Sequence, residues 1–185
     1  MNTWDKLGTT GGQIEIVPYS AEWPELFELE AHRIKSVCGD IITVVEHIGS
    51  TAIPGMPAKP ILDIMPGLDS HQDGLKTIAP LQQLGYEYFG ENGIPGRFYF
   101  GLRSEQRSVV HVHIFEIGTE NWFRHLIFRD YLRSNPAVAA QYAELKRELA
   151  VRFRNDREAY TNGKSEFINS VVQEARMNYW REKNA

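Results

Sequence analysis

The residues best suited to chemistry lie between positions 46 and 63, where a Gly-Ser pair follows one apolar run and an aspartate lies inside the next. Gly49 has no Cβ, so the backbone can turn sharply there and an anion can approach its peptide N–H groups. Ser50 and Thr51 add hydroxyl donors. Asp63 has isoleucine, leucine and methionine neighbours, and a carboxylate buried among them needs a cation or several donors. The pattern predicts a phosphate site beside a metal ion, with a buried ion pair as the alternative.

Two histidines form the second candidate group. His111 and His113 alternate with β-branched residues, so a strand would place both imidazoles on one face. If that strand lies near Asp63, the three side chains could bind a metal, and nitrogen ligands favour Mn²⁺, Zn²⁺ or Fe²⁺ over Mg²⁺. Alternatively, one histidine could act as a general base toward a hydroxyl group. Glu116 has the opposite parity and could join only if the strand bends, while His47 is expected to be structural.

Cations that could neutralise a phosphate come from several parts of the chain. Lys59, Arg97 and Arg129 are the candidates, and Lys59 could also pair with Asp63. Residues 124–157 hold eight Lys and Arg against four acids, although the whole chain has a net charge of −4. This segment is interpreted either as a solvated helical face or as a basic wall facing an anionic substrate.

Tyr160 and Lys164 form a further pair that could reach the same cleft. A helix cap with a surface lysine is the alternative reading of this Tyr-x-x-x-Lys spacing.

These side chains need strands and helices to bring them together, and the apolar periodicity predicts alternating elements. Expected strands cover 14–18, 41–48, 61–65, 86–89, 97–102 and 107–117, the last two as a hairpin. Expected helices cover 21–38, 70–84, 119–132, 136–149 and 164–179. Residues 1–13 are expected to form a flexible tail before a single domain over 14–185, with a sheet portion over about 14–118 and a helical portion over about 119–185.

The chain also resembles a known family over roughly residues 14–170. A Gly-Ser pair followed, after twelve residues, by a strand aspartate resembles the signature of the nucleotidyltransferase superfamily. More closely, the chain resembles the GrpB family, a group of uncharacterised predicted nucleotidyltransferases that is also related to the C-terminal extension of some dephospho-CoA kinases. The matching segments are Ile16–Tyr19 with Trp23-Pro24, His47–Thr51 with Pro54-Gly55, Lys59–Asp63, His111–His113, Phe128–Arg133 with Pro136, and Tyr142, Lys146, Tyr160, Lys164 and Phe167.

The residues and the resemblance together imply an α+β fold, with a nucleotidyltransferase-like mixed β-sheet packed with helices and further helices at the C-terminus. The implied activity is metal-dependent transfer of a nucleotidyl group from a nucleoside triphosphate to an unknown acceptor. The expected catalytic residues are Asp63 and His113, the expected metal ligands Asp63, His111 and His113, and the expected phosphate-binding residues Gly49, Ser50, Thr51, Lys59, Arg97 and Arg129. The expected cofactor is a divalent cation, Mg²⁺ or Mn²⁺ before Zn²⁺ or Fe²⁺.

One departure from the superfamily pattern bears on this activity. Active members usually carry a second acid two positions after the first, where side chains share a face of the strand, and Met65 stands there instead. A thioether is a poor ligand for Mg²⁺. The alternative is therefore a non-catalytic domain that binds a nucleotide, a CoA-like ligand or a protein partner. A metal-dependent hydrolase or oxygenase using the same acid and histidines is a third hypothesis, but it leaves the Gly-Ser turn unexplained.

Composition and charge limit the remaining function classes. The net charge of −4 argues against a general nucleic-acid binder. No apolar run approaches the roughly 20 residues that span a bilayer, and the N-terminus lacks a signal-peptide pattern, so a cytoplasmic location without membrane contact is expected. Cys38 is the single cysteine, which excludes an internal disulfide and a thiolate metal cluster and predicts a small core residue.

Overall fold

The computed structural model describes residues 4, 6–9 and 13–183. The strands are β1 (Val44–Ile48), β2 (Leu62–Leu68), β3 (Glu87–Tyr88), β4 (Phe98–Ser104) and β5 (Arg107–Glu116). The α-helices are α1 (Trp23–Cys38), α2 (Ile78–Gln83), α3 (Glu120–Ser134), α4 (Pro136–Arg152), α5 (Arg157–Asn162) and α6 (Ser165–Lys183). Three 3₁₀ helices are η1 (Gly39–Ile41), η2 (Ser50–Ala52) and η3 (His71–Thr77).

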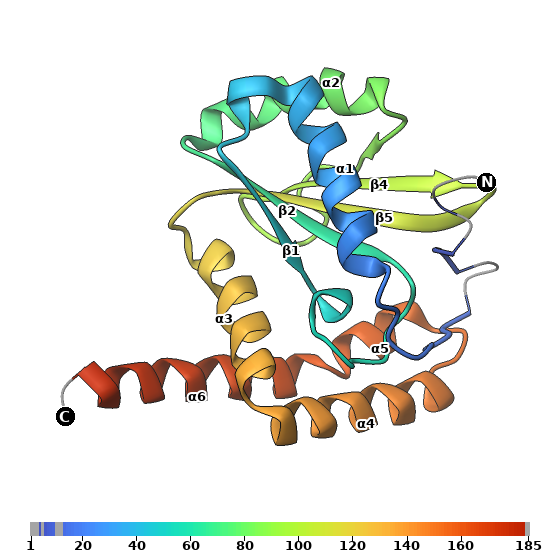
Figure 1. Ribbon diagram of the computed structural model, residues 1–185, viewed down its shortest axis with the longest axis vertical. Helices are drawn as coiled ribbons and strands as arrows, with labels where there is room; N and C mark the ends of the chain where they lie inside the picture. Colours follow the sequence, from blue (N-terminus) through green and yellow to red (C-terminus); the bar gives the residue numbers. More distant parts are fainter. Residues whose placement is uncertain (1–3, 5, 10–12, 184–185) are drawn as a thin grey trace.

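The strands form one five-stranded mixed sheet in the order β1-β2-β5-β4-β3 (Figure 1). The central pair β2–β5 is parallel, whereas β1–β2, β5–β4 and β4–β3 are antiparallel. This arrangement confirms the predicted α+β class and the predicted hairpin. The parallel pair matters most for function, because it places Asp63 directly beside His111.

The two faces of the sheet have different neighbours because side chains alternate along each strand. One face packs against α1 and α2 in the main core, and its strand residues are Leu62, Ile64, Leu68, Phe98, Phe100, Val110, Val112 and Ile114. The other face carries Asp63, His111 and His113, and α3 covers its far end through a cluster of Trp122, Met65, Phe115 and Ile48. The polar side chains therefore occupy the part of this face that α3 leaves uncovered.

The C-terminal helices form a second layer beside the sheet (Figure 1). Their apolar faces build a separate core from α3, α4 and α6, and the loop between β1 and β2 contributes Ile53 and Met56 to it. Tyr160 of α5 joins Leu149 and Ile14 in a further small cluster. Sheet and helical layer thus meet through the loop that follows the Gly-Ser turn.

The N-terminal segment differs from the expected flexible tail where it is described. Trp4 and Leu7 are buried in the main core, and Thr9 pairs with Ser108 of β5. Burial of these two apolar side chains favours order over a free tail. Residues 1–3, 5 and 10–12 lie outside the described residues.

Two predicted elements have a different secondary structure from the one expected. Residues 14–18 do not form a strand, because pairing is limited to a single bridge from Val17 to Ala58 and Pro18 cannot donate to a ladder. The predicted helix over 70–84 begins as the 3₁₀ helix η3, in which a Cβ on Gly74 would lie 2.0 Å from the Phe98 ring. That close packing requires glycine, which is a weak α-helix former.

Within the described residues, no helix combines the length and apolar character needed to cross a bilayer.

Candidate functional site

The centre of the site is a carboxylate held between two imidazoles. Asp63 Oδ1 lies 3.4 Å from His111 Nδ1 and 3.3 Å from His113 Nε2. The three side chains share one face because β2 and β5 run in parallel with Asp63 and His111 in register. The structure thus brings together the acid and both histidines that the sequence singled out, while Glu116 lies apart and accepts a hydrogen bond from the His71 N–H at 3.1 Å.

Gly49 is required by this carboxylate as well as by the turn. The turn has a positive φ of 69°, which L-residues with a side chain rarely adopt. A Cβ added to Gly49 would lie 2.4 Å from Asp63 Oδ2. The glycine therefore makes room for the acid, and the predicted turn after the first strand is confirmed.

The surrounding groups keep Asp63 ionised and His113 neutral. Burial acts to raise the pKa of Asp63, but hydrogen bonds with His111 and His113 outweigh it and hold that pKa well below its usual range. Burial lowers the pKa of His113 to about 4, although the negative charge of Asp63 opposes the shift. At neutral pH the His113 ring consequently carries a single proton.

Arg97 determines which nitrogen of His113 carries that proton. Arg97 Nη1 lies 3.1 Å from His113 Nδ1, while Nε and Nη2 donate to the backbone carbonyls of Glu91 and Asn92 at 3.1 and 2.7 Å. A guanidinium group has donors only, so His113 Nδ1 must be the acceptor. We therefore assign the proton to Nε2, where it points at Asp63. The neutral imidazole bridges the positive Arg97 and the negative Asp63.

This assignment bears on whether the site fits a metal ion. One donor atom each from Asp63, His111 and His113 lie within 4.8 Å of one another, a mixed oxygen and nitrogen set that suits Mn²⁺ or Zn²⁺. Asp63 fits such an ion as it stands. His111 fits it once the proton that Nδ1 donates to Asp63 moves to Nε2, where Ser108 Oγ lies 3.0 Å away and can accept it. His113 Nε2 does not, because a protonated nitrogen has no lone pair to donate to a metal.

Three lysines, here called the lysine cluster, gather near the Gly-Ser turn from separate segments. Lys146 of α4 is 2% exposed and donates to Ser50 Oγ at 2.9 Å. The ammonium groups of Lys59 and Lys164 face the ring of Tyr160, 5.3 and 4.5 Å from its centroid. The predicted approach of Tyr160 and Lys164 to the site agrees with these contacts, since the charge of Asp63 acts on Lys164.

The lysine cluster is short of negative charge. Burial, with repulsion from Lys164, lowers the pKa of Lys146 to about 7, and burial, with repulsion from Lys59, lowers that of Lys164 to about 8. In the part of the chain that the structure describes, none of the three lysines forms an ion pair with a carboxylate. One buried and two half-buried lysines without carboxylate partners mark a place where an anion would be stabilised.

Other predicted phosphate ligands are already engaged in structural contacts. Arg129 donates to Glu46 at 2.6 Å and to Asp130 at 2.7 Å. The Thr51 hydroxyl lies 3.0 Å from Nε2 of the buried His47. These contacts confirm the structural role expected for His47, whose pKa burial lowers to about 4. Binding of phosphate by Arg129 and Thr51 stays a prediction. Of the two interpretations of residues 124–157, a paired helical face or a basic wall, the ion pairs of Arg129 favour the first at this position.

Met65 fills the position of the expected second acid. It is fully buried against Trp122, Phe115 and Ile48. A carboxylate there would be desolvated under α3, so the site has one strand acid, and His111 is the histidine that remains to ligate a cation.

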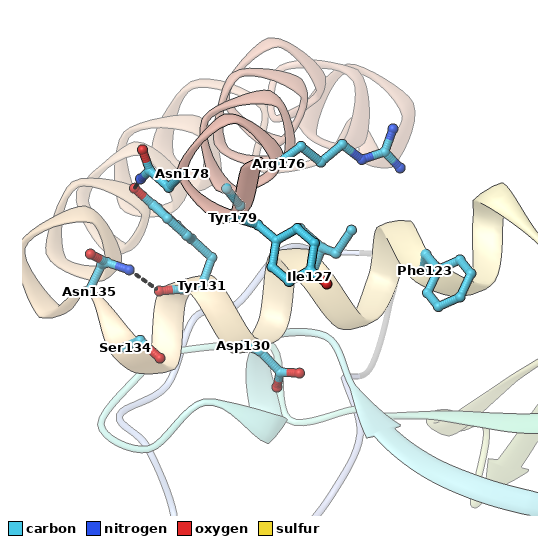
Figure 2. A pocket seen from close by; sticks show the side chains of 10 residues that line it. Phe123, Ile127, Asp130, Tyr131, Ser134, Asn135, Arg176, Asn178 and Tyr179 are labelled. Atoms are coloured by element: carbon cyan, nitrogen blue, oxygen red, sulfur yellow. Dashed lines mark hydrogen bonds between the residues drawn. The ribbon is translucent and has the colours of Figure 1, made fainter. Parts of the chain in front are cut away.

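A pocket of about 850 Å³ lies away from Asp63, between α3 and α6 (Figure 2). Its walls include Phe123, Ile127, Tyr131 and Tyr179, and Asn178 donates to the Tyr131 hydroxyl at 3.3 Å. It contains none of the predicted catalytic or metal residues, so we do not place the chemistry there.

Lys146 and Arg157 were predicted only as members of the basic segment 124–157, and no role was predicted for Ser108. Lys146 shares a helix face with the buried Tyr142 and Leu149, at spacings of four and three residues, and a lysine on an apolar stripe is a signal that could have identified it. No comparable local signal marks Ser108 or Arg157, because their roles depend on long-range packing. Ser108 Oγ, for example, lies 3.0 Å from His111 Nε2.

Comparison with known protein sequences identifies a family and several relatives. The family described as "GrpB protein" matches residues 13–174. The UPF0157 protein YqkA of Bacillus subtilis is 40% identical over 164 residues, which cover 89% of this chain and 48% of YqkA, so the chain spans about half of that relative. A dephospho-CoA kinase of Mycolicibacterium paratuberculosis is 26% identical over 186 residues, covering 88% of this chain and 46% of the kinase.

Solved structures extend the comparison to the fold. The conserved protein GrpB from Enterococcus faecalis superimposes with a TM-score of 0.83 at 36% identity, covering 90% of this chain and 99% of that one. The Cid1 poly(U) polymerase, in a structure with Mg 3′-dATP bound, gives a TM-score of 0.52 at 14% identity, covering 80% of this chain and 49% of Cid1. The second similarity concerns the fold alone, which is that of nucleotidyltransferases.

Proposed function

Because the chain belongs to the GrpB family and has a nucleotidyltransferase fold, we propose that it binds a nucleoside triphosphate and transfers its nucleotidyl group to an acceptor hydroxyl. The observation that carries this proposal is the lysine cluster beside the Asp63 carboxylate. Lys59, Lys146 and Lys164 come from three segments, are short of counter-ions and lie near a glycine turn. A polyphosphate chain supplies several negative charges at once, which a single carboxylate or hydroxyl ligand does not.

Each group of residues has a distinct role in the proposal. The lysine cluster holds the β- and γ-phosphates, and the Gly49–Ser50 turn places peptide N–H groups near them. Asp63 faces the α-phosphate, where a bound cation would separate the two negative charges, and the two imidazoles fix the orientation of the carboxylate. Arg97 keeps His113 oriented as a donor toward Asp63.

The proposed reaction breaks one phosphoanhydride bond and forms one ester bond. The acceptor oxygen bonds to the α-phosphorus while the bond from that phosphorus to the bridging oxygen breaks. Pyrophosphate leaves with the electron pair, and the acceptor hydroxyl proton passes to solvent water. Positioning and charge neutralisation supply most of the rate enhancement in such transfers.

A divalent cation would be held by Asp63 and His111, with phosphate oxygens and water completing its coordination. It would supply charge neutralisation at the phosphates. Mn²⁺ suits the mixed oxygen and nitrogen pair, with Mg²⁺ and Zn²⁺ as the alternatives.

A second candidate function is nucleotide or CoA-like ligand binding without transfer. Met65 favours it, because the second strand acid of active superfamily members is replaced here by a buried thioether. The lysine cluster serves a bound polyphosphate equally well in this case.

Titration calorimetry with ATP, GTP, CTP and UTP in the presence of Mn²⁺ tests binding. We expect at least one triphosphate to bind, and Lys146→Met to weaken it about tenfold or more, since a charged hydrogen bond contributes about 1.5–3 kcal/mol. Lys35→Met removes an exposed lysine of α1 and serves as the matched control. Absence of binding by the wild type, or equal loss in both variants, would refute the proposal.

Product analysis with labelled nucleotide and a mixture of small hydroxylated acceptors then separates the two candidates. Release of pyrophosphate that Asp63→Asn abolishes supports transfer. Binding without turnover across Mg²⁺, Mn²⁺ and Zn²⁺ supports the second candidate.

A further inference from the structure

A small pocket adjoins the site on the side of His111 that faces away from Asp63. It has a volume of about 210 Å³, and the side chains that bear on its role are Phe89, Tyr99, Arg103, Ser108, His111 and Arg157. His111 borders both spaces, because Nδ1 faces Asp63 at 3.4 Å and Nε2 faces Ser108 at 3.0 Å. A group bound in this pocket would lie about the width of one imidazole ring from the Asp63 carboxylate.

Gly101 creates the space. The sheet register runs from Asp63 through His111 to Gly101 of β4, so the glycine lies next to His111 across the ladder. Its missing side chain leaves the pocket open, and a Cβ there would come within 3.2 Å of the Phe89 ring. The backbone at Gly101 has no positive φ, so glycine is not needed for the strand conformation.

The charge of the pocket selects an anion. Arg103 and Arg157 both line it, and its described lining contains no Asp or Glu side chain. Arg103 is exposed, while Arg157 Nη2 donates to Thr9 Oγ1 at 3.3 Å. Two guanidinium forks suit a carboxylate or phosphate, which they can bind through paired hydrogen bonds.

Size and shape restrict the ligand further. Pockets for drug-sized ligands usually measure about 300–1,000 Å³, so this pocket takes something smaller. The rings of Phe89 and Tyr99, whose centroids are 5.9 Å apart, add an apolar part to the lining. The Ser108 hydroxyl and the His111 ring provide polar contacts for a hydroxyl group at the end nearest Asp63.

We propose that this pocket is the acceptor subsite and that the acceptor is a small anion bearing a hydroxyl group, with its phosphate or carboxylate on Arg103 and Arg157 and its hydroxyl toward His111. The inference rests on the proposed transfer reaction for its use, but anion binding at the pocket can be measured without nucleotide. Its failure can therefore be separated from failure of that reaction.

The test uses the full chain and three probes of similar size: glycerol 2-phosphate, glycerate and uncharged glycerol. Binding is followed by amide chemical shifts in NMR and by calorimetry. We expect one or both anions, but not glycerol, to shift the amides of Gly101 and Arg103. The anion that binds more tightly identifies the charged group.

Two variants and a control decide the outcome. Arg103→Met should weaken the bound anion about tenfold, the usual effect of losing a charged hydrogen bond. Gly101→Val should block it by filling the pocket, and Arg152→Met, which removes another exposed arginine, should change nothing. ATP affinity should stay within about twofold in all three variants, because the nucleotide is held by the lysine cluster.

Three results would overturn the inference. The first is shifts that map to Lys146 instead of Gly101, and the second is binding of glycerol as tight as that of the anions. The third is an equal loss of ATP and probe affinity in Arg103→Met, which would assign the pocket to the nucleotide. If ATP does not bind the wild type but the anions bind at Gly101, the pocket stands and the transfer reaction fails.

Discussion

Gly49→Ala tests the close packing of the turn against the site carboxylate. The substitution has two separate costs. The first is the backbone: at φ 69° and ψ −169° Gly49 lies in a region that is almost restricted to glycine, and a side chain there costs on the order of 1–3 kcal/mol. In addition, the new Cβ would lie 2.4 Å from Asp63 Oδ2, so the carboxylate must move and give up contacts with its imidazoles.

Gly55→Ala provides a control for a positive φ without the steric contact. Gly55 has a similar φ of 76°, but a Cβ there meets no atom within 4 Å. We expect Gly55→Ala to lower the free energy of unfolding by about 1–2 kcal/mol. Gly49→Ala should cost about 2 kcal/mol more, the amount expected when one hydrogen bond to a charged group is lost.

Urea denaturation of the two variants, alone and combined with Asp63→Ala, measures the difference as a double-mutant cycle. Removing the carboxylate should bring the cost of Gly49→Ala down toward that of Gly55→Ala. Equal costs for the two glycine variants in the wild-type background would refute the claim that Asp63 requires this glycine.

Three further predictions concern protonation. At pH 8, ATP binding should take up about 0.9 proton at Lys146 and about 0.5 at Lys164 if both become fully charged. Calorimetry in several buffers measures this uptake as the slope of the binding enthalpy against the ionisation enthalpy of the buffer. A slope of zero would show that neither lysine contacts the ligand. The pKa of Lys146 is about 7 in the folded protein and 10.5 for an unperturbed lysine, so the unfolded chain binds more protons between these pH values. Stability should therefore rise with pH in this range by up to about 1.4 kcal/mol per unit. Urea denaturation at several pH values should show that this part of the slope disappears in Lys146→Met, and an unchanged slope would contradict the assignment. Arg97→Met should let His113 Nδ1 carry the proton, which frees Nε2 for a metal and should raise Zn²⁺ affinity by about tenfold. Long-range ¹H–¹⁵N NMR of the wild type should show Nε2 protonated. A wild-type Nδ1–H tautomer would refute the assignment.

The sequence was sufficient to predict the centre of the site. Asp63, His111 and His113 lie in β-branched strands whose period of two fixes the face of each side chain. The Gly49 turn was predicted for the same reason, since an apolar run ends there at a residue without Cβ. These features depend on local pattern and on one long-range pairing that the family resemblance supports.

The surrounding charges could not be predicted in the same way. Arg129 and Lys146 lie on helices of similar composition, but one pairs with Glu46 and Asp130 while the other points to Ser50. The direction of a helical side chain depends on how the helix packs, which local sequence determines only weakly. The protonation of His113 likewise depends on Arg97, which two loop carbonyls hold in place.

The shared cores of the two layers also limit how this protein can be divided. Ile53 and Met56 of the β1–β2 loop complete the core of α3, α4 and α6, and Ile14 packs with Leu149. A fragment ending near residue 118 would therefore expose these side chains and lose the ammonium group that fastens the Ser50 loop. When such a unit is fused to another enzyme, both layers must be transferred together, because neither is a self-sufficient module.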